Sequence, residues 1–115
     1  MALQEQPDVL SLTFAALADP TRRAILSRLA LGEADVSALM EPFALSQPTI
    51  SKHLKVLERA GLVRRTVDGR RHVCRLDPGP LASASEWLRF YERYWTERLD
   101  ALEELFRTDP DREDR

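Results

Sequence analysis

Side chains that donate hydrogen bonds gather on one short predicted helix, residues 46–60. Ser46 is a strong N-cap, Pro48 suits the first turn, and Gly61 is placed to end the helix in a left-handed conformation. The donors on this helix are Thr49, Ser51, Lys52, Lys55 and Arg59. Such a set suits the major groove of DNA, which presents base acceptors between two lines of phosphates. An ordinary surface helix with solvated lysines is the alternative.

The other side of this helix is apolar. Ile50, Leu54 and Leu57 recur at intervals of four and three residues, which predicts one narrow stripe that faces a core. A second short helix, capped by Asp35, is expected just upstream at residues 35–43. Because only a few residues separate the two helices, the spacing predicts a helix-turn-helix whose second helix reads bases. A plain helical hairpin is the alternative.

A basic β-hairpin is predicted directly after the donor-rich helix. Residues 62–67 and 70–76 alternate as strands, and Asp68-Gly69 between them is a strong turn signal. The arginines of this hairpin are Arg64, Arg65, Arg70, Arg71 and Arg75. A hairpin with these cations can lie along a phosphate backbone or place an arginine in the minor groove. Solvated edge-strand charges that prevent aggregation are the alternative.

The formal net charge of −2 conceals this basic region. Residues 46–75 carry eight Lys and Arg against two acids. Residues 1–45 carry three Arg against six acids, Asp77 adds one acid, and residues 80–115 carry six Arg against ten acids. Local charge rather than net charge governs attraction to phosphate. The acidic remainder is expected to repel DNA and so to help determine which face docks.

Two helices are predicted before the helix-turn-helix. The first covers residues 8–18 and carries Leu10, Phe14 and Leu17 on one face. The second begins with Asp19 as its N-cap, followed by a proline in the first helical position. Its buried side is expected to comprise Ala24, Ile25, Leu26 and Leu29.

Arg22 and Arg23 fall in the first turn of this second helix. The helix dipole disfavours cations at that end. We expect the two arginines to be solvated, and compensation by an acid or by a DNA phosphate is the alternative.

A single long helix is predicted for residues 80–106, because no glycine lies in this segment and no proline follows its first residue. It would be about 40 Å long at the usual rise per residue. Its apolar stripe comprises Leu81, Ala84, Leu88, Tyr91, Trp95, Leu99, Leu102 and Phe106, and Trp87, Phe90 and Tyr94 widen it in the middle. A small domain cannot cover so many aromatic side chains by itself. One side is therefore expected to pack on the chain's own core and the other on a partner subunit, with an aromatic cofactor box as the alternative.

The remaining features exclude several classes of protein. Cys74 is the only cysteine, which rules out an intramolecular disulfide and favours a packed structural thiol over a redox switch. No segment reaches transmembrane length and no signal peptide is apparent, so a soluble cytoplasmic protein is expected. No paired carboxylates, nucleophile–histidine arrangement or phosphate-cradling glycine loop suggests an enzyme.

The length suits one domain at residues 1–107, with a disordered charged tail at residues 108–115.

The order of these elements resembles the ArsR/SmtB family of winged-helix transcriptional regulators. The resemblance is carried by residues 17–26 (LADPTRRAIL), 45–57 (LSQPTISKHLKVL), 60–63 (AGLV) and 68–71 (DGRR). It implies a mainly α fold with a small β-hairpin wing. It also implies a homodimer, paired through its first and last helices, that represses transcription from a palindromic operator in double-stranded DNA.

The resemblance also implies roles for individual residues. DNA contacts are expected from Gln47, Pro48, Thr49, Ser51, Lys52 and Lys55 on the second helix of the motif and from the wing residues Arg64, Arg70 and Arg71. The dimer interface is expected to include Leu10, Phe14, Trp87, Tyr91, Tyr94, Trp95, Leu99 and Leu102. His53 matches a common family histidine but projects nearer the apolar stripe, so a mainly structural role is expected for it.

The chain departs from the metal-sensing members of this family. Those members place a Cys-x-Cys pattern on the third helix, where this chain has Asp35 and Ser37. Others use Asp and His ligands on the last helix, where this chain has no histidine after His72. Soft divalent ions therefore lack their thiolate and imidazole ligands. We expect no metal and no cofactor, as in the metal-independent, autorepressor-like branch. A winged-helix module that contacts an acidic protein is the alternative function.

Overall fold

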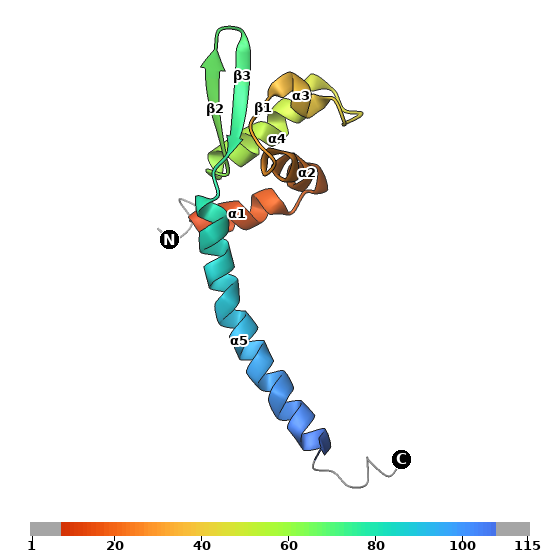
Figure 1. Ribbon diagram of the computed structural model, residues 1–115, viewed down its shortest axis with the longest axis vertical. Helices are drawn as coiled ribbons and strands as arrows, with labels where there is room; N and C mark the ends of the chain where they lie inside the picture. The colour runs from red at the N-terminus through yellow and green to blue at the C-terminus, as the bar shows by residue number, and fades with distance from the viewer. Residues whose placement is uncertain (1–7, 108–115) are drawn as a thin grey trace, which may run out of the picture. The chain divides into compact units, whose positions relative to one another are not determined.

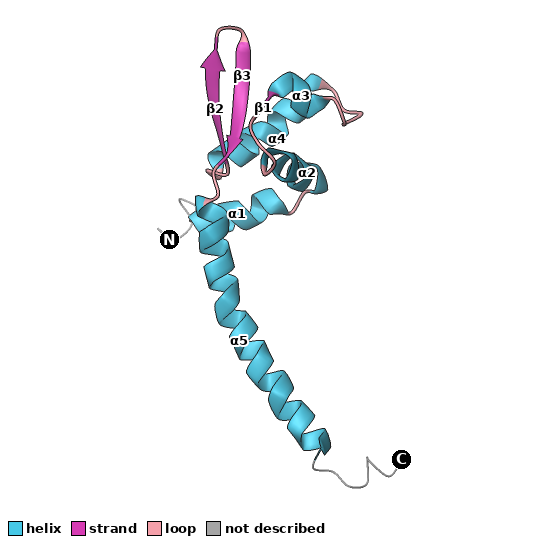
Figure 2. Cartoon of the chain, in the orientation of Figure 1, coloured by secondary structure: helices cyan, strands magenta, loops and turns pink. Residues whose placement is uncertain are grey.

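The computed structural model describes residues 8–107 and is mainly α-helical with a small antiparallel sheet (Figures 1 and 2). Its elements in chain order are α1 (Val9–Leu17), α2 (Pro20–Leu29), β1 (Ala34–Asp35), α3 (Val36–Met40), α4 (Gln47–Arg59), β2 (Val63–Asp68), β3 (Arg71–Leu76) and α5 (Gly79–Arg107). The predicted fold class, a helix-turn-helix with a hairpin wing, is confirmed. The chain forms two compact units, Met1–Ala84 and Ser85–Arg115. The predicted tail at residues 108–115 lies outside the described residues.

Side-chain caps begin the first four helices, as the sequence predicts for most of them. Asp8, Asp19, Asp35 and Ser46 accept hydrogen bonds from the backbone N–H groups of Ser11, Arg22, Ala38 and Thr49, at 2.6, 3.0, 2.8 and 3.3 Å. Each cap satisfies one of the donors that a helix N-terminus leaves without an intrahelical partner. These backbone hydrogen bonds are also the main reason that the pKa values of Asp8 and Asp19 are lowered.

The core of Met1–Ala84 lies between the helices and the sheet. Its largest fully buried side chains are Ile25, Leu39, Ile50, Leu54, Leu57, Leu62, Thr13 and Cys74. The predicted apolar stripe of α4 is therefore confirmed. Ala24, which we expected on the buried side of α2, is exposed. It lies about 200° around the helix from Leu26, so it cannot share the face that Ile25, Leu26 and Leu29 bury.

The sheet has the strand order β1-β3-β2 and is antiparallel throughout. Asp68 pairs with Arg71, so Gly69 and Arg70 form the turn, one residue later than the sequence suggested. Gly69 has a φ of +64° at the first central position, which fits the tight turns that join antiparallel strands. Arg70 is thereby placed at the tip of the hairpin rather than in its second strand.

Helix α5 extends from Gly79 to Arg107, close to the predicted limits. Ala84 is its only buried residue among those described, and every side chain from Ser85 to Arg107 is exposed in the single chain. The expectation that one side of its aromatic segment packs on the chain's own core and the other on a partner subunit stays a prediction, because that segment belongs to the second unit. Within the first unit, Leu81 of α5 packs against the hydrophobic core cluster.

No helix among residues 8–107 is both long enough and apolar enough to cross a membrane.

Candidate nucleic-acid interface

Burial of one side of α4 determines which side chains its other side presents. Gln47, Pro48, Lys52, Lys55 and Arg59 are exposed, and Thr49 and Ser51 are half-buried. The apolar residues Ile50, Leu54 and Leu57 are fully buried beneath them. All six α4 residues predicted to contact DNA therefore lie outside the core, on a helix that its own apolar stripe holds in place.

A network around Arg22 fixes α4 against the preceding helices. The Arg22 Nε and Nη2 atoms donate to the carbonyl oxygens of Ala16 and Ala15 at 2.7 and 3.0 Å. Its Nη1 atom lies 3.3 Å from Nδ1 of His53, and the same nitrogen of His53 lies 3.8 Å from Asp19. His53 projects from α4 with a side chain that is only 18% exposed, in agreement with the structural role expected for it.

The expectation that Arg22 and Arg23 are merely solvated is wrong. Arg23 also donates to a main-chain oxygen, that of Leu17, at 2.6 Å. The carbonyl groups at the C-terminal end of α1 carry partial negative charge, and that of Ala15 also accepts a hydrogen bond from the Ala18 N–H group at 3.2 Å. These carbonyl oxygens therefore stabilise the positive charges of Arg22 and Arg23, which the dipole at the start of α2 would otherwise disfavour.

Four of the five hairpin arginines form ion pairs within the chain. Arg64 pairs with Asp77 at 2.8 Å, Arg65 with Glu58, Arg71 with Asp35 at 3.5 Å, and Arg75 with Glu33 at 2.6 Å. Within residues 8–107, no ion pair involves Arg70, Lys52, Lys55 or Arg59. Within residues 46–75, the cations without an acidic partner therefore lie on α4 and at the tip of the hairpin.

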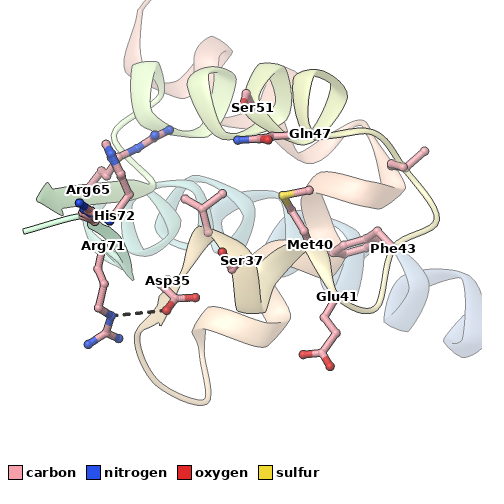
Figure 3. Close-up of a pocket in the computed structure, with 13 residues that line it drawn as sticks. Asp35, Ser37, Met40, Glu41, Phe43, Gln47, Ser51, Arg65, Arg71 and His72 are labelled. Atoms are coloured by element: carbon pink, nitrogen blue, oxygen red, sulfur yellow. Dashed lines mark ion pairs between the residues drawn. The ribbon is translucent and has the colours of Figure 1, made fainter.

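A groove lies between α3, α4 and the hairpin (Figure 3). Gln47 and Ser51 line it from α4, and Arg65, Arg70, Arg71 and His72 line it from the hairpin. Of the predicted DNA-contacting residues, the structure brings Gln47, Ser51, Arg70 and Arg71 to this groove. Lys52, Lys55, Pro48 and Thr49 are not among its lining residues. Arg64 is not either, because successive strand residues face opposite sides of the sheet and its neighbour Arg65 faces the groove.

The positions relevant to metal and redox chemistry have structural partners. Asp35 caps α3 and pairs with Arg71. The Cys74 thiol is buried, and this burial raises its pKa, as expected for a packed thiol rather than a reactive one. Within residues 8–107, no group of three or more His, Cys, Asp or Glu side chains is placed to hold a metal ion.

The residues predicted to form a dimer interface fall into two sets. Leu10 and Phe14 on α1 are half-buried in the first unit. In the second unit Trp87, Tyr91, Tyr94, Trp95, Leu99 and Leu102 are between 41% and 59% exposed. The rings of Trp87 and Tyr91 contact each other, with centroids 4.6 Å apart. An apolar surface of this extent is unusual on a monomeric protein.

Comparison with known proteins gives a consistent result. Residues 19–65 match the profile of the family described as bacterial regulatory protein, arsR family. The HTH-type transcriptional regulator Rv2034 of Mycobacterium tuberculosis is 43% identical over 96 residues, which cover 84% of this chain and 87% of that protein. The arsenical resistance operon repressor of Staphylococcus xylosus is 40% identical over 68 residues, 59% of this chain and 65% of that protein. The crystal structure of an ArsR family transcriptional regulator, RHA00566, aligns with a TM-score of 0.73 and 39% identity, over 77% of this chain and 98% of that one.

Proposed function

Because the chain belongs to the ArsR family of bacterial transcriptional regulators, we propose that it is a homodimeric repressor that binds an inverted-repeat operator without sensing a metal ion. The observation that carries this proposal is the exposed donor face of α4 beside an arginine at the hairpin tip. We call Gln47, Ser51, Lys52, Lys55 and Arg70 the reading surface. Each of its five members lies outside the core, and its three cations make no ion pair within residues 8–107.

The members of the reading surface suit different parts of duplex DNA. An amide such as that of Gln47 can form two hydrogen bonds with adenine in the major groove, and a serine hydroxyl can donate to or accept from a base edge. Lysines on the same helix suit the flanking phosphates, which position the helix without reading sequence. Arg70, at the hairpin tip, can reach a phosphate or the minor groove.

Pairing of two subunits would duplicate this surface. The exposed leucines and aromatic residues of α5 recur at helical spacing, and a second copy of the same helix offers a matching apolar face. A two-fold dimer reads two half-sites that lie about 34 Å apart, one turn of DNA. This geometry requires an operator with inverted symmetry.

The third helix supports a repressor that does not depend on metal. The carboxylate of Asp35 already accepts a hydrogen bond from the Ala38 N–H group and lies beside Arg71. Ser37, the second position of the sensor pattern, supplies a hydroxyl in place of a thiolate. Neither residue supplies a ligand that soft divalent ions prefer.

Selection of bound duplexes from a random library, followed by fluorescence anisotropy with nonspecific competitor DNA, tests the proposal. We expect an inverted repeat to be enriched and to remain bound in competitor. Substitution of Gln47 or Ser51 by alanine should change the preferred bases, because a good hydrogen-bonded pair between side chain and base discriminates by about 1–3 kcal/mol. Lys55→Ala should instead weaken all duplexes alike. If nonspecific DNA displaces every selected duplex equally well, the basic face serves an acidic partner through charge alone.

A further inference from the structure

We propose that the groove between α3, α4 and the hairpin binds a small organic anion with an apolar body, and that this ligand excludes DNA from α4. The first part concerns the groove alone. The second part, the exclusion of DNA, rests on the proposed function.

The groove has the dimensions of a ligand site. Its volume is about 690 Å³, and small-molecule sites commonly measure about 300–1,000 Å³. Three segments enclose it, namely α3 with the turn that follows, the first half of α4, and the hairpin, which is distant from the other two in the sequence. Figure 3 shows Gln47 and Ser51 on α4, with Ser37 and Met40 of α3 below them in this view.

The two ends of the groove differ in chemistry. Hairpin side chains supply the hydrogen-bond donors at one end, and Figure 3 shows Arg65, Arg71 and His72 together there. Met40 and Phe43 lie at the other end of the same view, where Glu41 also lines the groove with its carboxylate directed away from α4. The apolar lining residues are Val36, Met40, Phe43 and Leu45. A ligand that satisfies both ends must carry a polar head and an apolar body.

The charges at the donor end favour an anionic head. Arg65 is held by Glu58, and Arg71 lies 3.5 Å from Asp35 while its side chain stays 62% exposed. Arg70 makes no ion pair within the described part of the chain. The donor end therefore holds one cation in excess of its acidic partners. That excess suits a head with a single negative charge, such as a carboxylate, which Arg70 and Arg71 can bind through paired N–H groups.

Occupation of the groove has a consequence for DNA. Gln47 and Ser51 line the groove, and they are also the members of the reading surface that we propose contact bases. A ligand seated between them and α3 covers the donors that a base edge would use. Binding of this ligand and of DNA would therefore be mutually exclusive. A ligand that binds in the groove would release the protein from its operator.

The direct test uses sodium octanoate as the probe and octan-1-ol as its uncharged match. The chain has two methionines, Met1 and Met40, so a carbon-13 methyl spectrum of the full chain reports on the groove through one assignable signal. We expect octanoate to shift the Met40 methyl signal in a saturable manner, and octanol to shift it far less. No DNA is present, so this result does not depend on the proposed function.

Two leucine variants locate the site. Leu45→Gln removes an apolar side chain at the rim, where Leu45 is 40% exposed and outside the core cluster. Leu31→Gln makes the same change at a residue that is 85% exposed and does not line the groove. We expect Leu45→Gln to weaken octanoate binding about fivefold, because less apolar surface of the ligand is then removed from water. Leu31→Gln should leave it unchanged.

The regulatory part is tested by adding duplex DNA. At an octanoate concentration ten times its own dissociation constant, exclusive binding requires the affinity for DNA to fall about tenfold. A saturable octanoate shift with unchanged DNA affinity would overturn the exclusion of DNA. The binding site itself is overturned if octanoate leaves the Met40 signal unmoved, if octanol matches octanoate, or if the two leucine variants behave alike.

Discussion

The guanidinium of Arg71 lies 3.5 Å from the carboxylate of Asp35, the residue that caps α3. One side chain thus joins the start of the first helix of the helix-turn-helix to the basic hairpin. The backbone reinforces this link, since Asp35 pairs with Val73 in the sheet. Because Asp35 neutralises Arg71, it also limits the positive charge that the hairpin offers to DNA.

Asp35→Asn is expected to tighten DNA binding. Asparagine is as good an N-cap as aspartate, so α3 keeps its cap while Arg71 loses its anionic partner. The freed arginine adds one phosphate contact, which should steepen the dependence of log affinity on log salt by about 1 unit. Fluorescence anisotropy across a series of salt concentrations measures this slope.

Glu41→Gln is the matched control for this change. It removes the same charge from the C-terminal end of α3, where no ion pair forms within residues 8–107. An equal gain from Glu41→Gln would show that net charge, rather than release of Arg71, explains the result.

Arg70→Ala is expected to weaken binding to all DNA sequences and to flatten the salt dependence by about 1 unit, because Arg70 is the hairpin arginine without an acidic partner in the described chain. Arg75→Ala removes the same charge from the same hairpin. Its effect should be much smaller, because Arg75 is held at 2.6 Å by Glu33. The same anisotropy series compares the two variants, and equal effects would contradict the assignment of Arg70 to the reading surface.

Leu99→Glu is expected to dissociate the proposed dimer. Removing one buried leucine costs about 1.5–3 kcal/mol, and two-fold symmetry doubles this cost, so the dimer dissociation constant should rise by at least about a hundredfold. Sedimentation velocity over a range of concentrations measures the change. Thr96→Glu adds the same charge at an exposed polar position on the same helix and should leave the dimer intact. A wild-type chain that sediments as a monomer would refute the proposed dimer outright.

Acid should destabilise the first unit through its caps. The pKa values of Asp8, Asp19 and Asp77 are lowered, first of all by backbone N–H groups that donate to their carboxylates. A lowered pKa in the folded state means that folding favours the ionised form of the carboxyl group. The contribution of these carboxylates to the free energy of unfolding is complete at a pH above the ordinary aspartate pKa of 3.8. It is lost as the pH falls below that pKa.

Chemical denaturation at a series of pH values measures this effect. The variant Asp19→Asn keeps a capping side chain and cannot titrate. Its free energy of unfolding should therefore fall less steeply than that of the wild type in the acid range. Identical pH profiles would show that the Asp19 cap does not contribute to the acid sensitivity.

Local signals in the sequence predicted most of the fold. Asp19, Asp35 and Ser46 each begin a helix because their side chains can accept a nearby backbone N–H group, which depends only on residues three positions ahead. The stripe of Ile50, Leu54 and Leu57 likewise follows from helical spacing alone. Such features need no knowledge of the rest of the chain.

Features that depend on distant residues were missed. Strand β1 has two residues and exists only because β3 pairs with it. The ion pair of Arg75 with Glu33 joins residues 42 positions apart, and no spacing rule predicts it. The groove was missed for the same reason, because Gln47 and Arg70 come from segments that only the folded chain brings together.

Hydroxyl-radical footprinting on the DNA immediately upstream of the gene for this protein tests the central claim most directly, namely that two paired reading surfaces bind one operator. We predict two protected stretches related by two-fold symmetry, with centres about 34 Å apart, and two subunits bound at each site. A single protected stretch occupied by one subunit, or no protection at moderate salt, would contradict the account.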